Sequence, residues 1–133
     1  MTLKDADLRC KCGCGLLRLH RGFRDEMDAV AAELGRPVYA RSCCRCKAHN
    51  DRPSSEGGAG GHVRSLHVGD FPHHADKGQQ GALAVDWGTP DGAYRGALFA
   101  ILWKRGWSVG WGNGFLHGDR RDWIGMPQTT FDY

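Results

Sequence analysis

Three short segments of this chain each join an apolar or glycine-containing run to a side chain that binds metal ions. They are Ser65-Leu66-His67, Ala84-Val85-Asp86 and Phe115-Leu116-His117-Gly118-Asp119. A charged group beside apolar residues is costly to bury unless it is paired or bound to a metal. Two histidines and one aspartate form a zinc-binding set with one open coordination position, which catalytic sites need and structural sites lack. The fold must therefore bring together segments that are far apart in the sequence.

The composition indicates an ordinary globular protein. The chain has 133 residues, of which 41% are hydrophobic and 25% charged, which fits one domain over residues 1–133 with one core. The net charge of +3 is too small to predict a nucleic-acid partner, although it is compatible with docking on an anionic cell wall. No run approaches the ~20 apolar residues that a membrane-spanning helix requires, so we expect no membrane insertion. We also expect a monomer.

The first residues do not have the pattern of a secretory signal. Lys4, Asp5, Asp7 and Arg9 spread both charges through this segment. We therefore expect the protein to be made in a cytoplasm and not to be exported by a cleaved leader.

Six cysteines in such a chain indicate reduced thiols or a metal site rather than a disulfide framework. Cys10, Cys12 and Cys14 are close enough in sequence to share one ion, and a thiolate from position 43, 44 or 46 could complete the set. A second, structural zinc site at Cys10, Cys12, Cys14 and Cys46 is one hypothesis for these thiols, although zinc knuckles usually have the spacing Cys-x-x-Cys. Disulfides are the alternative if the protein acts outside the cell membrane.

The first half of the chain predicts one helix and one strand. Apolar residues recur at steps of three and four over residues 16–34, which indicates a helix, and Gly35 stands at its C-cap position. Residues 38–40 are predicted to form a strand. The polar, glycine-rich residues 50–61 and the irregular residues 68–80 are predicted to form loops.

The second half predicts a strand, a helix and a hairpin. Residues 82–87 form an apolar strand that carries Asp86, and a helix follows that is capped by Thr89 or Asp91 and ends at Gly106. The hairpin strands are residues 107–111 and 114–117, joined by Gly112-Asn113. This order of elements predicts an α+β fold in which helices flank a small antiparallel sheet.

Four segments, taken in order, resemble blocks of a known family. Residues 42–50 resemble its segment Ser-Gly-Tyr-Arg-Cys-x-x-His-Asn, and residues 60–67 resemble its block Gly-Gly-x-x-x-Ser-x-His. Residues 82–86 resemble the block that ends in a liganding aspartate, and residues 115–119 resemble the closing Phe-Val-His-Val-Asp. Residues 10–15 are similar to the start of phage-encoded members. The family is that of the zinc D-alanyl-D-alanine carboxypeptidases and L-alanyl-D-glutamate endopeptidases, which includes phage endolysins and is structurally related to the Hedgehog signalling domain.

The resemblance implies a Hedgehog/DD-peptidase-like fold and a zinc metallopeptidase that hydrolyses peptidoglycan stem peptides, as a bacteriophage endolysin does. It implies His67, Asp86 and His117 as the ligands of one catalytic Zn²⁺. It implies Arg45 as a partner of the substrate carbonyl or the oxyanion, and Ser65 as a residue that contacts the substrate. Such an enzyme would be made in the cytoplasm of a host bacterium before its release to the cell wall.

The chain departs from the family pattern at two places. His67 and Asp86 are separated by 18 residues, more than is usual in the family, and His73 or His74 in this insertion could replace His67 as a ligand. The glutamate that several members carry just before the last histidine is absent. On a strand, Asp119 projects to the same face as His117, so Asp119 is the candidate general base or, alternatively, a residue that orients the ligand.

Other functions remain open from the sequence. A D-Ala-D-Ala carboxypeptidase or dipeptidase would use the same residues. A non-catalytic cell-wall-binding or virion structural module would keep the fold without turnover. A thiolate zinc module over residues 10–46 could bind protein or nucleic acid, but the chain lacks a basic stripe.

Overall fold

A five-stranded sheet forms the centre of the protein, for which the computed structural model describes residues 3–133. The strand order is β1-β2-β4-β3-β5. Neighbouring strands run antiparallel except β3 and β5, which run parallel. The strands are β1 (Ala40–Ser42), β2 (Ala84–Gly88), β3 (Ser108–Trp111), β4 (Phe115–Asp119) and β5 (Thr130–Asp132). The predicted α+β class is confirmed, and β5 adds a parallel strand to the predicted antiparallel sheet.

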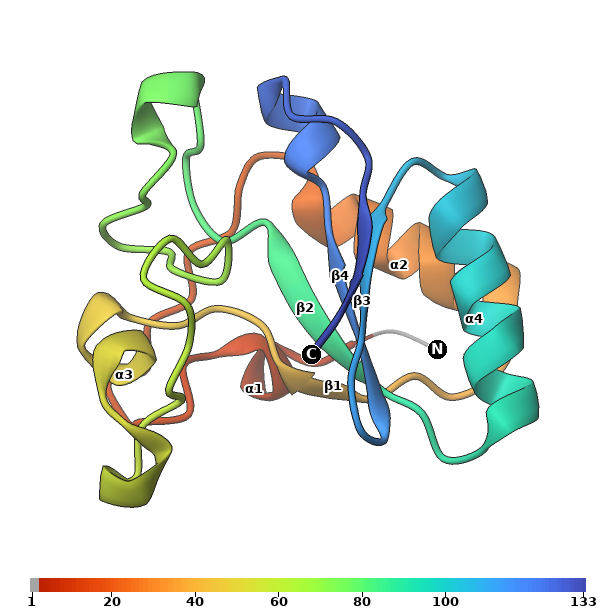
Figure 1. Cartoon of the computed structure of the whole chain (residues 1–133), viewed down its shortest axis with the longest axis horizontal. Helices are drawn as coiled ribbons and strands as arrows, with labels where there is room; N and C mark the ends of the chain where they lie inside the picture. The colour runs from red at the N-terminus through yellow and green to blue at the C-terminus, as the bar shows by residue number, and fades with distance from the viewer. Residues whose placement is uncertain (1–2) are drawn as a thin grey trace.

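Two longer helices, α2 (Phe23–Leu34) and α4 (Gly92–Lys104), pack together on one side of the sheet (Figure 1). Buried side chains from both helices and from the strands form the core there, among them Phe23, Met27, Trp87, Leu98, Leu102, Trp107 and Leu116. The shorter elements are α1 (Asp5–Leu8), α3 (Lys47–Asp51) and the 3-10 turns η1 (Ser54–Glu56), η2 (Ala75–Lys77) and η3 (Arg121–Ile124). Within residues 3–133 the helices are too short or too polar to cross a bilayer.

The first predicted helix is wrong in its N-terminal part. Helix α2 begins at Phe23, after Gly22 with φ of 84°, rather than near residue 16. Residues 21 and 22 form a turn, and Leu19 forms an isolated parallel bridge with Ala82, so its apolar side chain packs against the core without belonging to a helix. The predicted end is confirmed, because Gly35 adopts φ of 65° and its N–H bonds to the Ala31 carbonyl.

The predicted second helix and hairpin are confirmed with small shifts. Asp91, one of the two candidate caps, accepts a hydrogen bond from the Tyr94 N–H at 2.8 Å. Strands β3 and β4 pair antiparallel, with Gly110 opposite His117. Strand β1 begins at Ala40, two residues later than the predicted start at residue 38.

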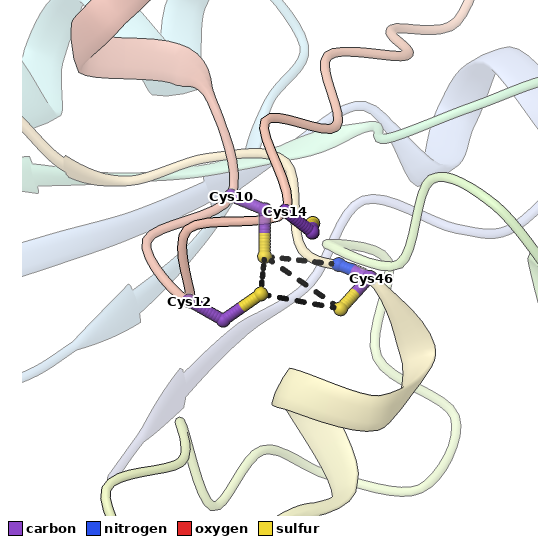
Figure 2. Close-up of side chains that lie close together, drawn as sticks. All are labelled: Cys10, Cys12, Cys14 and Cys46. Atoms are coloured by element: carbon purple, nitrogen blue, oxygen red, sulfur yellow. Dashed lines mark hydrogen bonds between the residues drawn. The ribbon is translucent and has the colours of Figure 1, made fainter.

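A long connection, residues 43–83, runs from β1 to β2 and lies on the opposite side of the molecule from α2 and α4 (Figure 1). It includes α3 and the turns η1 and η2, so the predicted loops contain short helical turns. The N-terminal segment meets this connection at the start of α3, where Cys10, Cys12 and Cys14 lie near Cys46 (Figure 2).

Candidate metal centre

Strands β2 and β4 place Asp86 and His117 directly opposite each other in the sheet. Side chains alternate between the two faces of a strand, so Leu116 enters the core while His117 and Asp119 share the other face. A Cβ added to Gly118, which lies between them, would stand 2.9 Å from the Trp107 ring and 3.1 Å from Trp87 Nε1. The two indoles therefore pack directly behind the backbone that carries the polar residues.

Backbone pairing inside the long connection brings His67 to the same place. The Arg45 N–H bonds to the His67 carbonyl at 2.9 Å, and the Gly69 N–H bonds to the Arg45 carbonyl at 2.9 Å. The Leu83 N–H bonds to the Leu66 carbonyl at 2.8 Å, which ties this loop to the segment that enters β2. These bonds fix both Arg45 and His67 next to Asp86.

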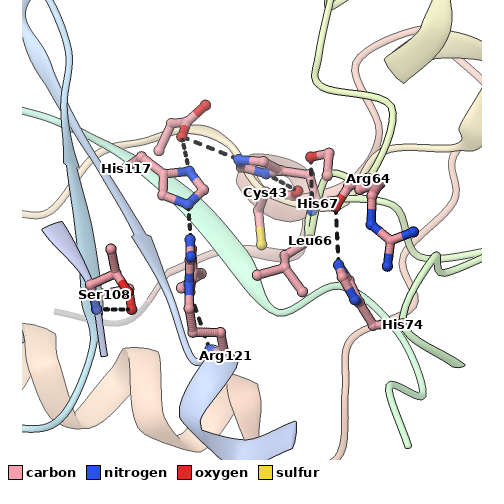
Figure 3. Close-up of polar contacts among 12 residues, drawn as sticks. Cys43, Arg64, Leu66, His67, His74, Ser108, His117 and Arg121 are labelled. Carbon is pink, nitrogen blue, oxygen red and sulfur yellow. Dashed lines mark hydrogen bonds and ion pairs between the residues drawn. The ribbon is translucent and has the colours of Figure 1, made fainter. Parts of the chain in front are cut away.

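The three predicted ligands converge on one point. Donor atoms of His67, Asp86 and His117 all lie within 4.8 Å of one another. His67 Nε2 and His117 Nδ1 each lie 3.2 Å from Asp86 Oδ1. All three side chains are largely buried, and the two rings are contributed by the loop and by β4 (Figure 3). The sequence-based prediction that the fold brings these residues together is therefore confirmed.

The tautomer of His67 leaves a lone pair facing Asp86. His67 Nδ1 lies 2.7 Å from the Cys43 carbonyl, which can only accept, so Nδ1 carries the proton of the neutral ring (Figure 3). Burial lowers the pKa of His67, which favours this neutral form. The unprotonated Nε2 then faces a carboxylate oxygen with no hydrogen between them. A cation held between the two atoms would convert this repulsion into two ligand bonds.

A carboxylate behind His117 fixes the orientation of its ring. His117 Nε2 donates to Asp119 Oδ2 at 2.7 Å, and the Asp119 oxygens also accept from Arg121 Nε at 2.9 Å and Nη2 at 2.8 Å. Burial opposes charge on His117, but the bonds with Asp119 and Asp86 outweigh burial and raise its pKa to about 9. Burial likewise opposes ionisation of Asp119, but Arg121 and His117 lower its pKa to about 2.

These contacts bear on the two roles predicted for Asp119. Its side chain is fully buried, and both oxygens are engaged by His117 and Arg121. The contacts support the second role, in which Asp119 holds a ligand histidine in its binding tautomer.

The other oxygen of Asp86 is held by Arg45. Arg45 Nη2 donates to Asp86 Oδ2 at 3.1 Å, Nε donates to Ser42 Oγ at 3.0 Å, and Nη1 donates to Asn50 Oδ1 at 3.2 Å. Burial opposes ionisation of Asp86, but His67 and His117 outweigh it and hold the Asp86 pKa far below the ordinary value. A Cβ at Gly61 would lie 2.2 Å from Asn50 Oδ1 and 2.8 Å from Arg45 Nη1, so only glycine permits this close packing.

A cavity of about 770 Å³ opens beside the three side chains. Its wall includes Ser65, whose Oγ accepts from the His67 N–H at 3.2 Å. On the other side lie Phe131 and Tyr133, with ring centroids 5.5 and 6.0 Å from that of His117. The cavity size is typical of sites for small molecules or short peptide segments.

The alternative ligands lie elsewhere. His74 Nε2 bonds to the Arg64 carbonyl at 3.2 Å, and neither His73 nor His74 belongs to the group of converging donor atoms (Figure 3). Among the cysteines, Cys10, Cys12, Cys14 and Cys46 form a second group of converging donors. Cys43 and Cys44 are buried outside it.

Sequence reasoning missed three residues around the site. Arg121 holds Asp119, while Phe131 and Tyr133 border the cavity from β5 and its end. The signal for Arg121 was weak, since one arginine two residues after an aspartate is common. The alternation of Thr130, Phe131, Asp132 and Tyr133 is a period-two pattern that could have indicated the last strand.

The donor set matches the chemistry of zinc, since two imidazole nitrogens and one carboxylate oxygen are ligands that Zn²⁺ accepts in open sites. The hydrogen bond that His117 Nε2 donates to Asp119 supplies the outer support typical of such ligands. No protein-family model, curated protein or solved structure matches the chain.

Proposed function

We propose that this protein is a zinc-dependent peptidase with a Hedgehog/DD-peptidase-like fold that hydrolyses peptidoglycan stem peptides, in the manner of a phage endolysin. The observation that carries the proposal is the convergence of His67, Asp86 and His117 beside an open cavity. A structural zinc site is normally closed by a fourth protein ligand, whereas this set provides three and borders a cavity.

The arrangement of the resembling segments supports the same proposal. Residues 42–50, 60–67, 82–86 and 115–119 resemble family blocks in sequence order, and each contributes residues to the cavity wall. The first block runs from the end of β1 into α3, the second lies in the long connection just before the insertion, and the last two lie on adjacent strands. Their meeting at one cavity is what the resemblance predicts.

Zinc at these three side chains would act as a Lewis acid toward a peptide carbonyl and would lower the pKa of water. The chain's own residues prepare this chemistry. Asp119 and the Cys43 carbonyl fix the ring orientations of His117 and His67, so that His117 Nδ1 and His67 Nε2 both face Asp86. The Nδ1 proton of His117 would leave when a metal ion binds there. Because these partners are in place before substrate arrives, the site needs little rearrangement on binding.

Arg45 is positioned to stabilise charge on a substrate oxygen. It borders the cavity, and each Nη of a guanidinium carries a second N–H beyond the ones that bond to Asn50 and Asp86. Arg64 adds positive charge to the wall, because Arg45 and Arg121 already balance the two wall carboxylates, Asp86 and Asp119. An anionic substrate such as a stem peptide with free carboxylates suits this wall.

The test is digestion of purified peptidoglycan by the zinc-loaded protein, with released peptides identified by mass spectrometry. We expect cleavage at L-Ala-D-Glu or D-Ala-D-Ala bonds, loss of cleavage after chelation, and recovery when Zn²⁺ is returned. The variant His117→Ala serves as the inactive control. Intact peptidoglycan after incubation with folded, zinc-loaded protein would refute the enzymatic proposal.

A non-catalytic wall-binding or virion structural module is the second candidate. The pairing of Asp119 with His117 and Arg121 favours it, because both carboxylates of the cavity wall are engaged and neither is free to accept a proton. Sedimentation of the protein with insoluble peptidoglycan, without release of peptides, would support this module over the peptidase.

A further inference from the structure

We propose that Cys10, Cys12, Cys14 and Cys46 bind one structural Zn²⁺ ion as four thiolates, and that this ion joins the N-terminal segment to the start of α3. The four sulfurs lie within 4.8 Å of one another (Figure 2). They lie outside the cavity wall and share no residue with the His67, Asp86 and His117 set, so this proposal does not depend on the proposed function.

The sulfur–sulfur distances match a tetrahedral site. Cys10 Sγ lies 3.4 Å from Cys12 Sγ and 3.8 Å from Cys46 Sγ, and Cys12 Sγ lies 3.7 Å from Cys46 Sγ. Zinc–sulfur bonds of about 2.3 Å at tetrahedral angles place sulfurs about 3.8 Å apart. A disulfide requires about 2.05 Å, and all four cysteines are free.

Backbone N–H groups point at these sulfurs, as they do where thiolates carry negative charge. The Cys46 N–H bonds to Cys10 Sγ at 3.4 Å, the His49 N–H bonds to Cys46 Sγ at 3.3 Å, and the Leu16 N–H bonds to Cys14 Sγ at 3.5 Å. Such N–H···S bonds stabilise ligating thiolates and fix their orientation. Three of the four sulfurs thus have a support that a neutral thiol does not require.

The local backbone is built to present three thiols on one side. Gly13 and Gly15 adopt φ of 94° and 77°, the left-handed conformation that favours glycine, and so turn the segment sharply around Cys14. The Arg9 side chain closes this turn by donating to the Gly15 carbonyl at 3.0 Å. The close spacing Cys-x-Cys, which departs from the usual knuckle, is accommodated by this glycine turn.

The donor set selects the metal. Four thiolates with no nitrogen or oxygen donor form a closed tetrahedral site, for which Zn²⁺ is the common occupant in a structural role. The remaining thiols do not compete, because Cys44 bonds with the backbone of Arg18 and Cys43 is buried in the core. The set is therefore complete at four ligands.

The ion would connect two distant parts of the chain. Cys10 and Cys46 are 36 residues apart, and Cys46 both caps α3 and directly follows Arg45. Zinc binding at these cysteines would hold the backbone of Arg45, whose guanidinium contacts Asp86. The thiolate site would thus stabilise the fold and brace one wall of the cavity.

Native mass spectrometry of the wild-type protein, purified with Zn²⁺ and without strong chelators, tests the assignment without any substitution. We expect about two zinc ions per chain, and one of them retained in His67→Ala/His117→Ala. One zinc ion in wild type with none in that double variant, iron in place of zinc, or a disulfide among the four cysteines would overturn the proposal.

Substitution of cobalt for zinc identifies the donor atoms. In wild type and in His67→Ala/His117→Ala we expect the sulfur-to-cobalt charge-transfer absorption of a tetrahedral thiolate site. The absorption should disappear in Cys12→Ser/Cys14→Ser and persist in the control Cys44→Ala, whose thiol lies outside the set. Absorption that survives in Cys12→Ser/Cys14→Ser, or that is absent from wild type, would refute the thiolate site.

Discussion

Two buried carboxylates of this protein, Asp86 and Glu26, have the same side-chain exposure of 12% but very different partners. Glu26 accepts hydrogen bonds from Arg105 at 2.8 and 3.0 Å, from Arg120 at 2.9 Å and from Trp107 Nε1 at 2.7 Å. All of these donors keep their protons at any ordinary pH. The hydrogen bonds of Glu26 therefore persist at any ordinary pH at which its carboxylate is ionised, and they connect α2 to the segments that precede β3 and follow β4.

Only one of the two carboxylate oxygens of Asp86 is bound by a group that stays positively charged at any ordinary pH. Arg45 binds its Oδ2, while Oδ1 faces the ring nitrogens of His67 and His117. Imidazole nitrogens can exchange a proton for a metal ion. Asp86 Oδ1 and the two ring nitrogens can therefore hold either a proton or a metal ion between them. The difference between the two carboxylates is thus one of partner chemistry and not of burial, and it separates a structural ion-pair cluster from a candidate reactive site.

The largest effect on this comparison is expected from His117→Ala. Removal of one ligand should empty the site and, for the proposed peptidase, reduce turnover by roughly 10³-fold or more, because a bound metal would supply several kcal/mol of transition-state stabilisation. Zinc content by mass spectrometry and peptide release from peptidoglycan measure the two effects. Retention of both the ion and turnover would show that His117 is not a ligand.

A smaller effect is expected from Arg45→Ala. If Arg45 stabilises charge on the substrate oxygen, turnover should fall by about 10²-fold while zinc content stays unchanged. Arg45→Lys keeps the charge but loses the planar fork, so it should recover only part of the activity. Parent-level hydrolysis by Arg45→Ala would remove Arg45 from the mechanism.

The variant Asp119→Asn should weaken zinc binding at the histidine site by about 10- to 100-fold, since it removes the negative charge and leaves one acceptor oxygen where His117 and Arg121 now share two. A titration against a competing chelator measures this affinity. Asp132→Asn, which changes an exposed carboxylate on β5, is the matched control. Equal affinities in the two variants would argue against an orienting role for Asp119.

Glu26→Gln should leave zinc content and the turnover of folded protein unchanged. It should lower the free energy of unfolding by about 1–3 kcal/mol, because charge-assisted bonds to Arg105 and Arg120 are lost. Urea unfolding of both proteins at neutral pH provides the measurement. A loss of activity without a loss of stability would contradict the separation of the two carboxylates.

The pH dependence of the stability of wild type and Glu26→Gln tests whether the charge of Glu26 stabilises the fold. Burial opposes ionisation of Glu26, but Arg105 and Trp107 outweigh it and lower its pKa below the ordinary 4.5. The stabilisation is therefore present above pH 4.5 and is lost as pH falls through the folded-state pKa. The stability difference between wild type and Glu26→Gln should shrink over that acidic range. A difference that stays constant there would show that the charge of Glu26 does not stabilise the fold.

The sequence allowed the elements with strong local signals to be predicted. The hairpin of β3 and β4, the cap at Asp91 and the end of α2 at Gly35 follow from nearby residues, and the structure confirms them. The start of α2 could not be predicted from periodicity, because Leu19 packs beside Ala82 far along the chain. Local patterns do not contain such distant contacts.

In the candidate site, too, some features could be predicted from local sequence and others could not. His67, Asp86 and His117 were predicted as ligands from their short apolar contexts and from the family resemblance, and the structure brings their donor atoms together. The roles of their partners depend on contacts that no local pattern encodes. The Cys43 carbonyl selects the His67 tautomer, and Arg121 engages Asp119, which had been predicted as a general base or an orienting residue.

The two indoles behind Gly118 have a practical consequence for altering this protein. Any larger residue at position 118 would collide with Trp87 or Trp107, so the spacing of the strand residues is set by aromatic packing on the reverse face. Variant libraries aimed at new specificity should therefore keep these three positions fixed. Ala59, His62 and Arg64 border the cavity from a loop and are the better place for diversity.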